Sequence, residues 1–172
     1  MSATPLPRVT LEPAVEADAP AIASLRVAVA ERLTERFGQG PWSAAGSERG
    51  VLALLRSSSM FVVRQADDVI ATVRLASKKP WAIDRTFFGA AERPIYLTDM
   101  AVAPAVQGRG FGRRALADAA AIAAAWPADA IRLDAYDAEA GAGVFYARCG
   151  YREVGRANYR GTGLVYFERV LS

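Results

Sequence analysis

The segment Ile95–Tyr136 constrains the fold more than any other part of the sequence. Ile95–Ala103 has the apolar, β-rich composition of a strand and stops before Pro104. Gly110–Trp126 carries apolar residues at helical spacing, and Ile131–Tyr136 is again typical of a strand. A strand, a helix and a strand in such close succession require two parallel strands joined by a right-handed crossover. We therefore expect a sheet that contains a parallel pair.

The remaining segments predict further strands and helices around this unit. The other expected strands are Arg8–Glu12, Met60–Gln65, Val69–Ala76, Tyr151–Tyr159 and Leu164–Leu171, and the other expected helices are the one that Asp18 caps and Gly38 ends, Ala45–Arg56 and Ala140–Arg148. The order is β-α-α-β-β-β-α-β-α-β-β. This predicts an α/β fold of the mixed α+β kind, with a largely antiparallel sheet.

Length and composition indicate a single globular domain over residues 1–172. The chain has 172 residues, of which 52% are hydrophobic, which is enough to bury a sizeable core. No repeat and no long biased linker divides it.

The scarcity of two residue types excludes several kinds of chemistry. The sequence contains no histidine, which excludes histidine-based triads and histidine metal ligands, and we expect no metal site. Cys149 is the only cysteine, so no internal disulfide forms. The single cysteine and an N-terminus without an apolar run favour a cytoplasmic protein.

The charge pattern argues against polyanion and membrane partners. The net charge is +3, and the basic residues are interspersed rather than clustered, so no nucleic-acid binding is expected. The longest weakly polar stretch, Ala115–Trp126, is too short to span a bilayer.

The strongest chemical signal is the glycine-rich turn Gln107–Arg114, between the strand and the helix. Its glycines let the backbone approach a ligand closely, and the first N–H groups of a helix form an anion site. Arg109, Arg113 and Arg114 stand where the helix dipole disfavours cations, and no acid between Ala103 and Ala117 compensates them. This combination predicts that an anionic ligand binds the turn.

The glycine-rich turn differs from two other phosphate-binding motifs, the Walker loop and the dinucleotide-binding turn. A Walker loop is excluded because no Gly-Lys-Ser/Thr ending exists. Gly110, Gly112 and Ala115 match a dinucleotide-binding spacing, with Asp134 at the end of the next strand, so an NAD-binding oxidoreductase stays as a lesser alternative. The intervening segment Ala103–Gln107 and the short chain that remains after Asp134 count against it.

Two blocks of the sequence resemble a known family. Met100-Ala-Val-Ala-Pro104, followed by Gln107-x-x-Gly110-x-Gly112, is similar to the acetyl-CoA signature of the GNAT N-acetyltransferase superfamily. The pair Phe145-Tyr146 and the later Cys149-Gly-Tyr151 resemble its second block. The family often has Asn where this chain has Glu139. The resemblance covers nearly the whole chain and is strongest over residues 95–155.

The resemblance implies a function and a set of ligand-binding residues. It implies a GNAT-like fold whose fourth and fifth strands are parallel and splay apart. It also implies an N-acetyltransferase that uses acetyl-CoA as co-substrate, transfers the acetyl group by direct attack and accepts a primary amine of a small molecule or peptide. The acetyl-CoA-binding residues would be Met100, Ala101, Val102, Gln107, Gly108, Arg109, Gly110, Phe111, Gly112 and Arg113. A non-catalytic CoA-binding module remains the alternative, and an exposed edge strand makes a homodimer possible.

Catalytic roles follow from the same resemblance. Tyr146 matches the family's general acid, although a tyrosine on such a helix also packs in cores. Asp99 is the candidate base, and its alternative is a charge paired with an arginine; Asp134 is a weaker candidate. Phe145 and Cys149 are interpreted as buried packing residues.

The acceptor side is expected to lie in three loops. These are Phe37–Ser43, Lys78–Phe88 and Asn158–Gly163. They hold the aromatic residues Trp42, Trp81, Phe87, Phe88 and Tyr159. The aromatic side chains either enclose the acceptor or cap the hydrophobic core.

Overall fold

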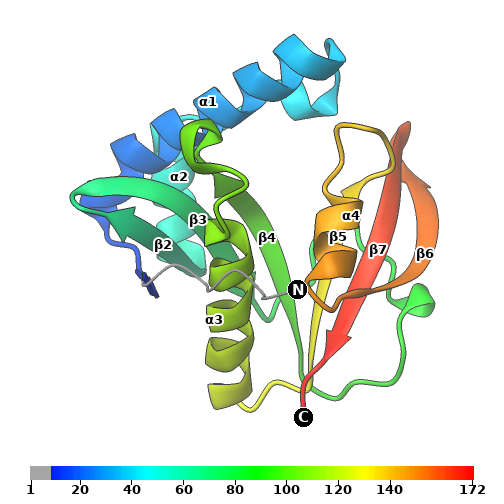
Figure 1. The fold of residues 1–172 in the computed structure, drawn as a ribbon. Coiled ribbons are helices and arrows are strands. Elements are labelled where there is room, and N and C mark those ends of the chain that lie inside the picture. Colours follow the sequence, from blue (N-terminus) through cyan, green and yellow to red (C-terminus); the bar gives the residue numbers. More distant parts are fainter. Residues whose placement is uncertain (1–8) are drawn as a thin grey trace, which may run out of the picture. The chain divides into compact units, whose positions relative to one another are not determined.

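The computed structural model describes residues 9–172, in which seven strands form one mixed sheet in the order β1-β2-β3-β4-β5-β7-β6 (Figure 1). The strands are β1 (Leu11–Pro13), β2 (Ser59–Gln65), β3 (Asp68–Ala76), β4 (Pro94–Val102), β5 (Ala130–Tyr136), β6 (Arg152–Tyr159) and β7 (Thr162–Val170). The helices are α1 (Ala19–Phe37), α2 (Glu48–Ser57), α3 (Phe111–Ala125) and α4 (Gly143–Arg148). The predicted fold class and the predicted order of elements are confirmed. Arg8, where the first strand was expected to begin, lies outside the described residues.

The predicted parallel pair is the pair β4 and β5. Pro94–Tyr96 pairs in parallel register with Ala130–Arg132, and α3 makes the connection. β5 pairs with β7 in antiparallel register along its whole length, and β7 continues the hairpin with β6. The mixture arises because a crossover through a helix returns a strand in the same direction, whereas a hairpin reverses it.

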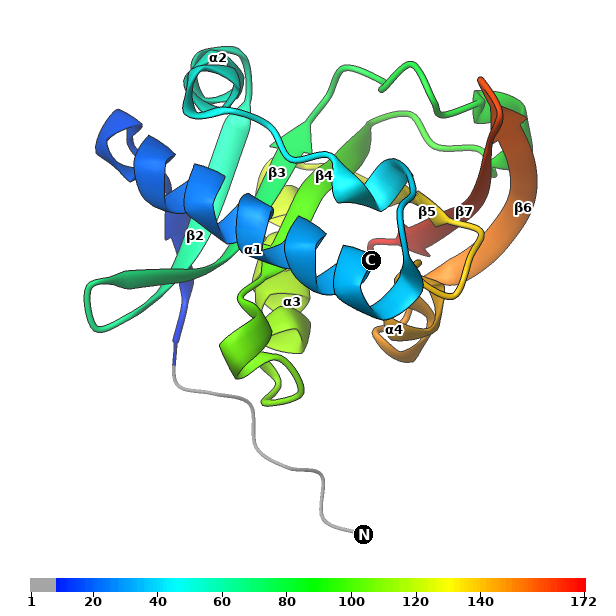
Figure 2. The same cartoon turned by 90° about the horizontal axis from the view of Figure 1, so that it is seen from above.

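The chain forms two compact units, residues 1–74 with 99–119 and residues 75–98 with 120–172. In the first unit, α1 and α2 pack on one face of β2 (Figure 2). The buried residues of this cluster are Ala19, Ile22, Val51, Met60 and Val62. Among residues 9–172, none of the helices has the length and apolar character needed to cross a bilayer.

The ends of α1 show one prediction confirmed and one corrected. Gly38 ends the helix with a φ of 80°, a left-handed conformation that favours glycine, and donates its N–H to Thr34 O. Asp18 occupies the N-cap position, but its side chain makes no capping hydrogen bond. Its carboxylate instead accepts from Val15 N at 2.8 Å and from Arg64 Nη2 at 2.7 Å. The carboxylate of Asp18, which was expected to cap α1, therefore binds Arg64 of β2 instead.

The core of the second unit contains a buried ion pair. Arg132 on β5 and Glu168 on β7 have only 4% of their side-chain surface exposed, and Arg132 Nε donates to Glu168 Oε2 at 2.8 Å. Arg132 Nη2 also donates to Gly89 O at 2.7 Å, and its guanidinium lies 4.9 Å from the centre of the Phe88 ring. The pair thereby ties the connection between β3 and β4 to the sheet.

We expect Arg132→Met to destabilise the protein by about 3–5 kcal/mol, because removal of one partner leaves a buried carboxylate without its counter-charge. The measurement is the free energy of unfolding in urea. The matched control is Arg156→Gln, since Arg156 pairs with Glu153 at the surface and is expected to change stability little. Equal stability of the Arg132→Met variant and the wild type would contradict this role of the buried pair.

Candidate active site

The glycine-rich turn connects the end of β4 to the beginning of α3. A single 3-10 turn covers Pro104–Val106, and the backbone then adopts left-handed conformations at Gly108 (φ 78°) and Gly110 (φ 88°). Gln107 Nε2 donates to Val102 O at 3.0 Å and so closes the turn against the end of β4. Glycine is needed at both left-handed positions because a Cβ strains this backbone conformation.

The first turn of α3 carries main-chain donors that the helix does not use. Arg114 N is the first N–H to bond back along the helix, to Gly110 O at 2.9 Å. The N–H groups of Phe111, Gly112 and Arg113 precede it and therefore have no carbonyl one turn earlier within α3. Together with the helix dipole, these donors suit an anion.

The arginines around the turn differ in their partners. Arg114 Nε lies 3.0 Å from Asp118 Oδ1, so the expectation that no acid compensates these arginines is wrong for Arg114. Asp118 stands one helical turn later, just outside the stretch considered in the sequence, and also accepts from Leu11 N. Within residues 9–172, Arg109 and Arg113 form no salt bridge and are exposed. They remain the charges available to an anionic ligand.

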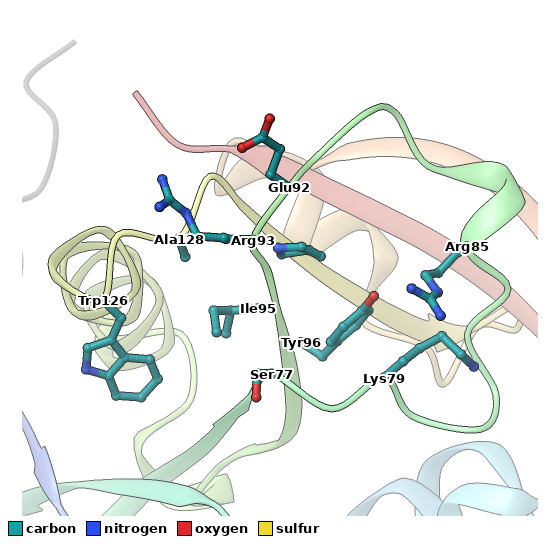
Figure 3. A pocket seen from close by; sticks show the side chains of 10 residues that line it. Ser77, Lys79, Arg85, Glu92, Arg93, Ile95, Tyr96, Trp126 and Ala128 are labelled. Atoms are coloured by element: carbon teal, nitrogen blue, oxygen red, sulfur yellow. The ribbon is translucent and has the colours of Figure 1, made fainter.

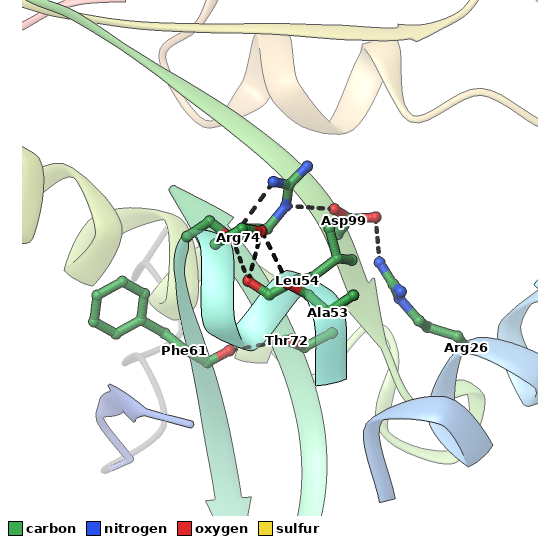
Figure 4. Close-up of polar contacts among 9 residues, drawn as sticks. Arg26, Ala53, Leu54, Phe61, Thr72, Arg74 and Asp99 are labelled. Carbon is green, nitrogen blue, oxygen red and sulfur yellow. Dashed lines mark hydrogen bonds and ion pairs between the residues drawn. The ribbon is translucent and has the colours of Figure 1, made fainter. Parts of the chain in front are cut away.

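Asp99 occupies an unusual position in β4. Its φ of 53° lies in the left-handed region, which a residue inside a strand rarely adopts. Arg26 Nη2 donates to Asp99 Oδ1, and Arg74 Nε donates to Asp99 Oδ2 at 2.7 Å (Figure 4). Asp99 is therefore paired with arginines, which is one of the two alternatives that the sequence left open. Its role as a general base stays a prediction.

Sequence reasoning missed Arg26 and Arg74. A signal for Arg74 existed, because it is the only charged residue in the run Val69–Ala76, whose other residues are apolar except for Thr72. Arg26 gave no such signal, because an arginine on a surface helix is ordinary.

Tyr146 lies on α4 and is buried. Its ring makes an edge contact with Tyr151, with centroids 5.8 Å apart, and a tilted contact with Phe167 at 6.1 Å. Burial is the main cause that raises the pKa of Tyr146 well above its usual value. The phenol is therefore protonated at neutral pH, as a general acid must be.

The neighbours of Tyr146 only partly match their predicted roles. The Phe145 ring packs against Tyr146 with centroids 5.4 Å apart, and Phe145 is half-buried. Cys149 was expected to be buried but is also half-buried, because it closes the last turn of the short helix α4.

The predicted site residues are distributed over the two units. Asp99, Met100–Val102 and Gln107–Arg113 belong to the first unit, and the end of β4 runs directly into the glycine-rich turn there. Tyr146 and the weaker base candidate Asp134 belong to the second unit.

A cavity of about 550 Å³ lies in the second unit, beside the beginning of β4 and the end of α3 (Figure 3). Trp126 stands on one side, and Lys79 and Arg85 on the other. Lys79 Nζ donates to the carbonyls of Pro80 and Ile83 at 2.8 and 2.7 Å, so its charge is used within its own loop. None of the predicted site residues lines this cavity.

The loop aromatic residues mostly cap the core. The rings of Phe87 and Phe88 pack on Tyr166, with centroids 5.4 and 5.5 Å away. Tyr159 packs against the same cluster. Trp81 differs, since 83% of it is exposed. Of the two alternatives, the structure therefore supports core capping for Phe87, Phe88 and Tyr159.

The structure therefore combines a mixed sheet, whose parallel pair is connected through α3, with a glycine-rich turn where α3 begins. The chain matches the model of the acetyltransferase (GNAT) family over residues 27–151, which is more than half of its length. It belongs to that family. A comparison with curated protein sequences gave no match.

Solved structures share the fold. An acetyltransferase of the GNAT family from Listeria monocytogenes superposes with a TM-score of 0.74 at 17% identity, covering 99% of each chain. A GCN5-related N-acetyltransferase from Rhodopseudomonas palustris gives 0.73 at 20% identity, covering 99% of this chain and 100% of the other. The protein yncA from Salmonella typhimurium, solved with acetyl-CoA, gives a TM-score of 0.68 at 16% identity, covering 96% of this chain and 95% of the other.

We expect the phenol of Tyr146 to titrate at a higher pH than an ordinary tyrosine, because burial raises its pKa above the ordinary value near 10. The neutral form is the one stabilised in the folded protein, so this contribution to stability is lost only as the pH rises past the unfolded value. NMR of ring-labelled tyrosine, with Tyr146→Phe for assignment, measures the titration. A midpoint for Tyr146 near pH 10 would contradict the burial argument.

Proposed function

We propose that the protein transfers an acetyl group from acetyl-CoA to a primary amine of a small molecule or peptide by direct attack. The observation that supports this most strongly is the turn at the beginning of α3, where unused main-chain donors, left-handed glycines and two unpaired arginines lie together. The family supplies the chemistry of acetyl transfer.

The residues of the turn fit the diphosphate of acetyl-CoA. An added Cβ at Gly108 would meet no atom within 4 Å, so the outer face of the turn is open to a ligand. The N–H groups of Gly108–Arg113 would hold the phosphate oxygens, and Arg109 and Arg113 would add charge. The main chain of Met100–Val102 would pair with the extended arm, as an added strand does. Acetyl-CoA supplies an activated acyl group as its thioester.

Tyr146 suits the role of proton donor. The phenol is protonated at neutral pH and so has a proton to give to a departing thiolate, although the burial that raises its pKa also makes it a weaker acid. The packing of its ring against Tyr151 and Phe167 fixes the direction in which the hydroxyl projects.

Asp99 is the proposed partner of the acceptor amine. A carboxylate offers about four lone-pair positions, and the two arginines take one position on each oxygen. The remaining positions can accept hydrogen bonds from an ammonium group and then its proton. An amine with a pKa near ~10 is mostly protonated at neutral pH and needs such a group before it attacks.

Acetyl-CoA is expected to raise the melting temperature of the wild type by mass action, and NADH is not. We expect Gly110→Ala to weaken acetyl-CoA binding at least about tenfold, because a Cβ strains the backbone and displaces the donors. Gly161→Ala is the matched control, because Gly161 has almost the same φ (86° against 88°) but lies in the turn between β6 and β7. Calorimetric titration measures both.

Equal loss of affinity in the two glycine variants would place the ligand elsewhere. Stabilisation by NADH alone would favour an oxidoreductase.

In turnover assays, Tyr146→Phe is expected to lower kcat about 10²-fold or more with little change in acetyl-CoA affinity. Asp99→Asn is expected to lower kcat/KM for the amine, since asparagine tolerates the left-handed backbone but takes no proton. Release of the CoA thiol measures the rate. Unchanged rates would remove these residues from the mechanism, and no thiol release with any amine would favour a non-catalytic binding module.

A further inference from the structure

Two arginines share one carboxylate within the first unit. Arg26 comes from α1, Arg74 from β3 and Asp99 from β4, and Figure 4 shows both guanidinium groups directed at the single carboxylate. Their side chains are 13% and 20% exposed. We call these three residues the Arg26–Asp99–Arg74 cluster.

The cluster carries one uncompensated positive charge. In the part of the chain that the structure describes, neither guanidinium forms a salt bridge with any acid other than Asp99. A purely structural ion pair is balanced by one arginine, and a second largely buried arginine costs desolvation without a counter-charge. The second arginine can therefore pair with an anion that arrives from outside.

The cluster also has donors that a ligand can reach. Each guanidinium has five N–H donors. Arg26 uses Nη2 for Asp99, and Arg74 uses Nε for Asp99 and Nη1 for a long contact of 3.5 Å with Ser58 Oγ. Among the described residues, no nitrogen of either arginine is both buried and without a partner, and both side chains keep some exposed surface that a ligand can reach. Asp99 holds both groups in place, which pre-organises them for a planar anion such as a carboxylate.

The position of the cluster relates it to the proposed reaction. Asp99 directly precedes Met100, the first residue of the segment proposed to bind the extended arm of acetyl-CoA. Gly46, in the connection between α1 and α2, lies beside Arg26, because a Cβ on it would be 3.4 Å from Arg26 Nη1. Phe37–Ser43, one of the loops expected on the acceptor side, covers the end of α1 and the beginning of this connection.

We propose, resting on the acetyltransferase function above, that the acceptor amine itself carries a carboxylate, which the Arg26–Asp99–Arg74 cluster binds. The substrate class is then amino acids and related amino carboxylates. Binding of the substrate carboxylate supplies the anion that balances the second arginine, and it places the amine beside Asp99.

The test compares amines that differ only in the carboxylate, namely tryptophan with tryptamine and lysine with cadaverine. Thiol release from acetyl-CoA gives kcat/KM for each amine. Arg26→Gln and Arg74→Gln are compared with the wild type and with Arg32→Gln, a control on the same helix whose side chain is 60% exposed. Calorimetric titration of tryptophan and lysine, without acetyl-CoA, gives binding separately from turnover, and the melting temperature of each variant confirms folding.

The wild type and Arg32→Gln are expected to prefer at least one amino acid over its decarboxylated partner by about tenfold or more, and the other two variants to lose this preference. Turnover without any such preference, or a preference that survives in both Arg26→Gln and Arg74→Gln, would overturn the inference and leave the acetyltransferase intact. Arginine-dependent binding of an amino acid without thiol release would instead support the carboxylate site and contradict the transferase. Neither binding nor preference in any protein would overturn the inference.

Discussion

The unused N–H groups at the beginning of α3 are the constraint on which the account of this protein depends. The parallel pair of β4 and β5 requires a crossover, here through α3, and the chain passes from β4 to that helix through residues 103–110. Gly108 and Gly110 adopt left-handed conformations on this path. The outcome is a set of main-chain donors at the positive end of a helix, a position that favours an anion. The proposed ligand class is therefore linked to the connection that the parallel pair requires.

Asp99 shows how a second constraint acts on the same strand. A left-handed aspartate inside a strand costs energy, and such a conformation persists only where its surroundings impose it. Arg26 on α1 and Arg74 on β3 both form ion pairs with its carboxylate. The two ion pairs with arginine therefore hold Asp99 in its left-handed backbone conformation. The same arginines that hold Asp99 give the site a positive charge beyond that of the glycine-rich turn.

The sequence predicted what local patterns determine. Alternating apolar residues, Pro104 and the glycines were sufficient for the order of elements, the parallel pair and the position of the turn. It could not predict pairs between distant residues, because a side chain's partner depends on packing that no local pattern encodes. Asp18 was expected to cap α1, but Arg64, distant in sequence, binds it. Asp99 likewise meets Arg26, 73 positions away.

The central claim is that the main chain of the turn before α3 binds the diphosphate of coenzyme A. The most direct measurement is a crystal structure of the protein with coenzyme A bound. The account predicts phosphate oxygens within hydrogen-bonding distance of the N–H groups of Gly108–Arg113, with Arg109 or Arg113 beside them. A diphosphate bound away from this turn, with its N–H groups facing solvent, would contradict it.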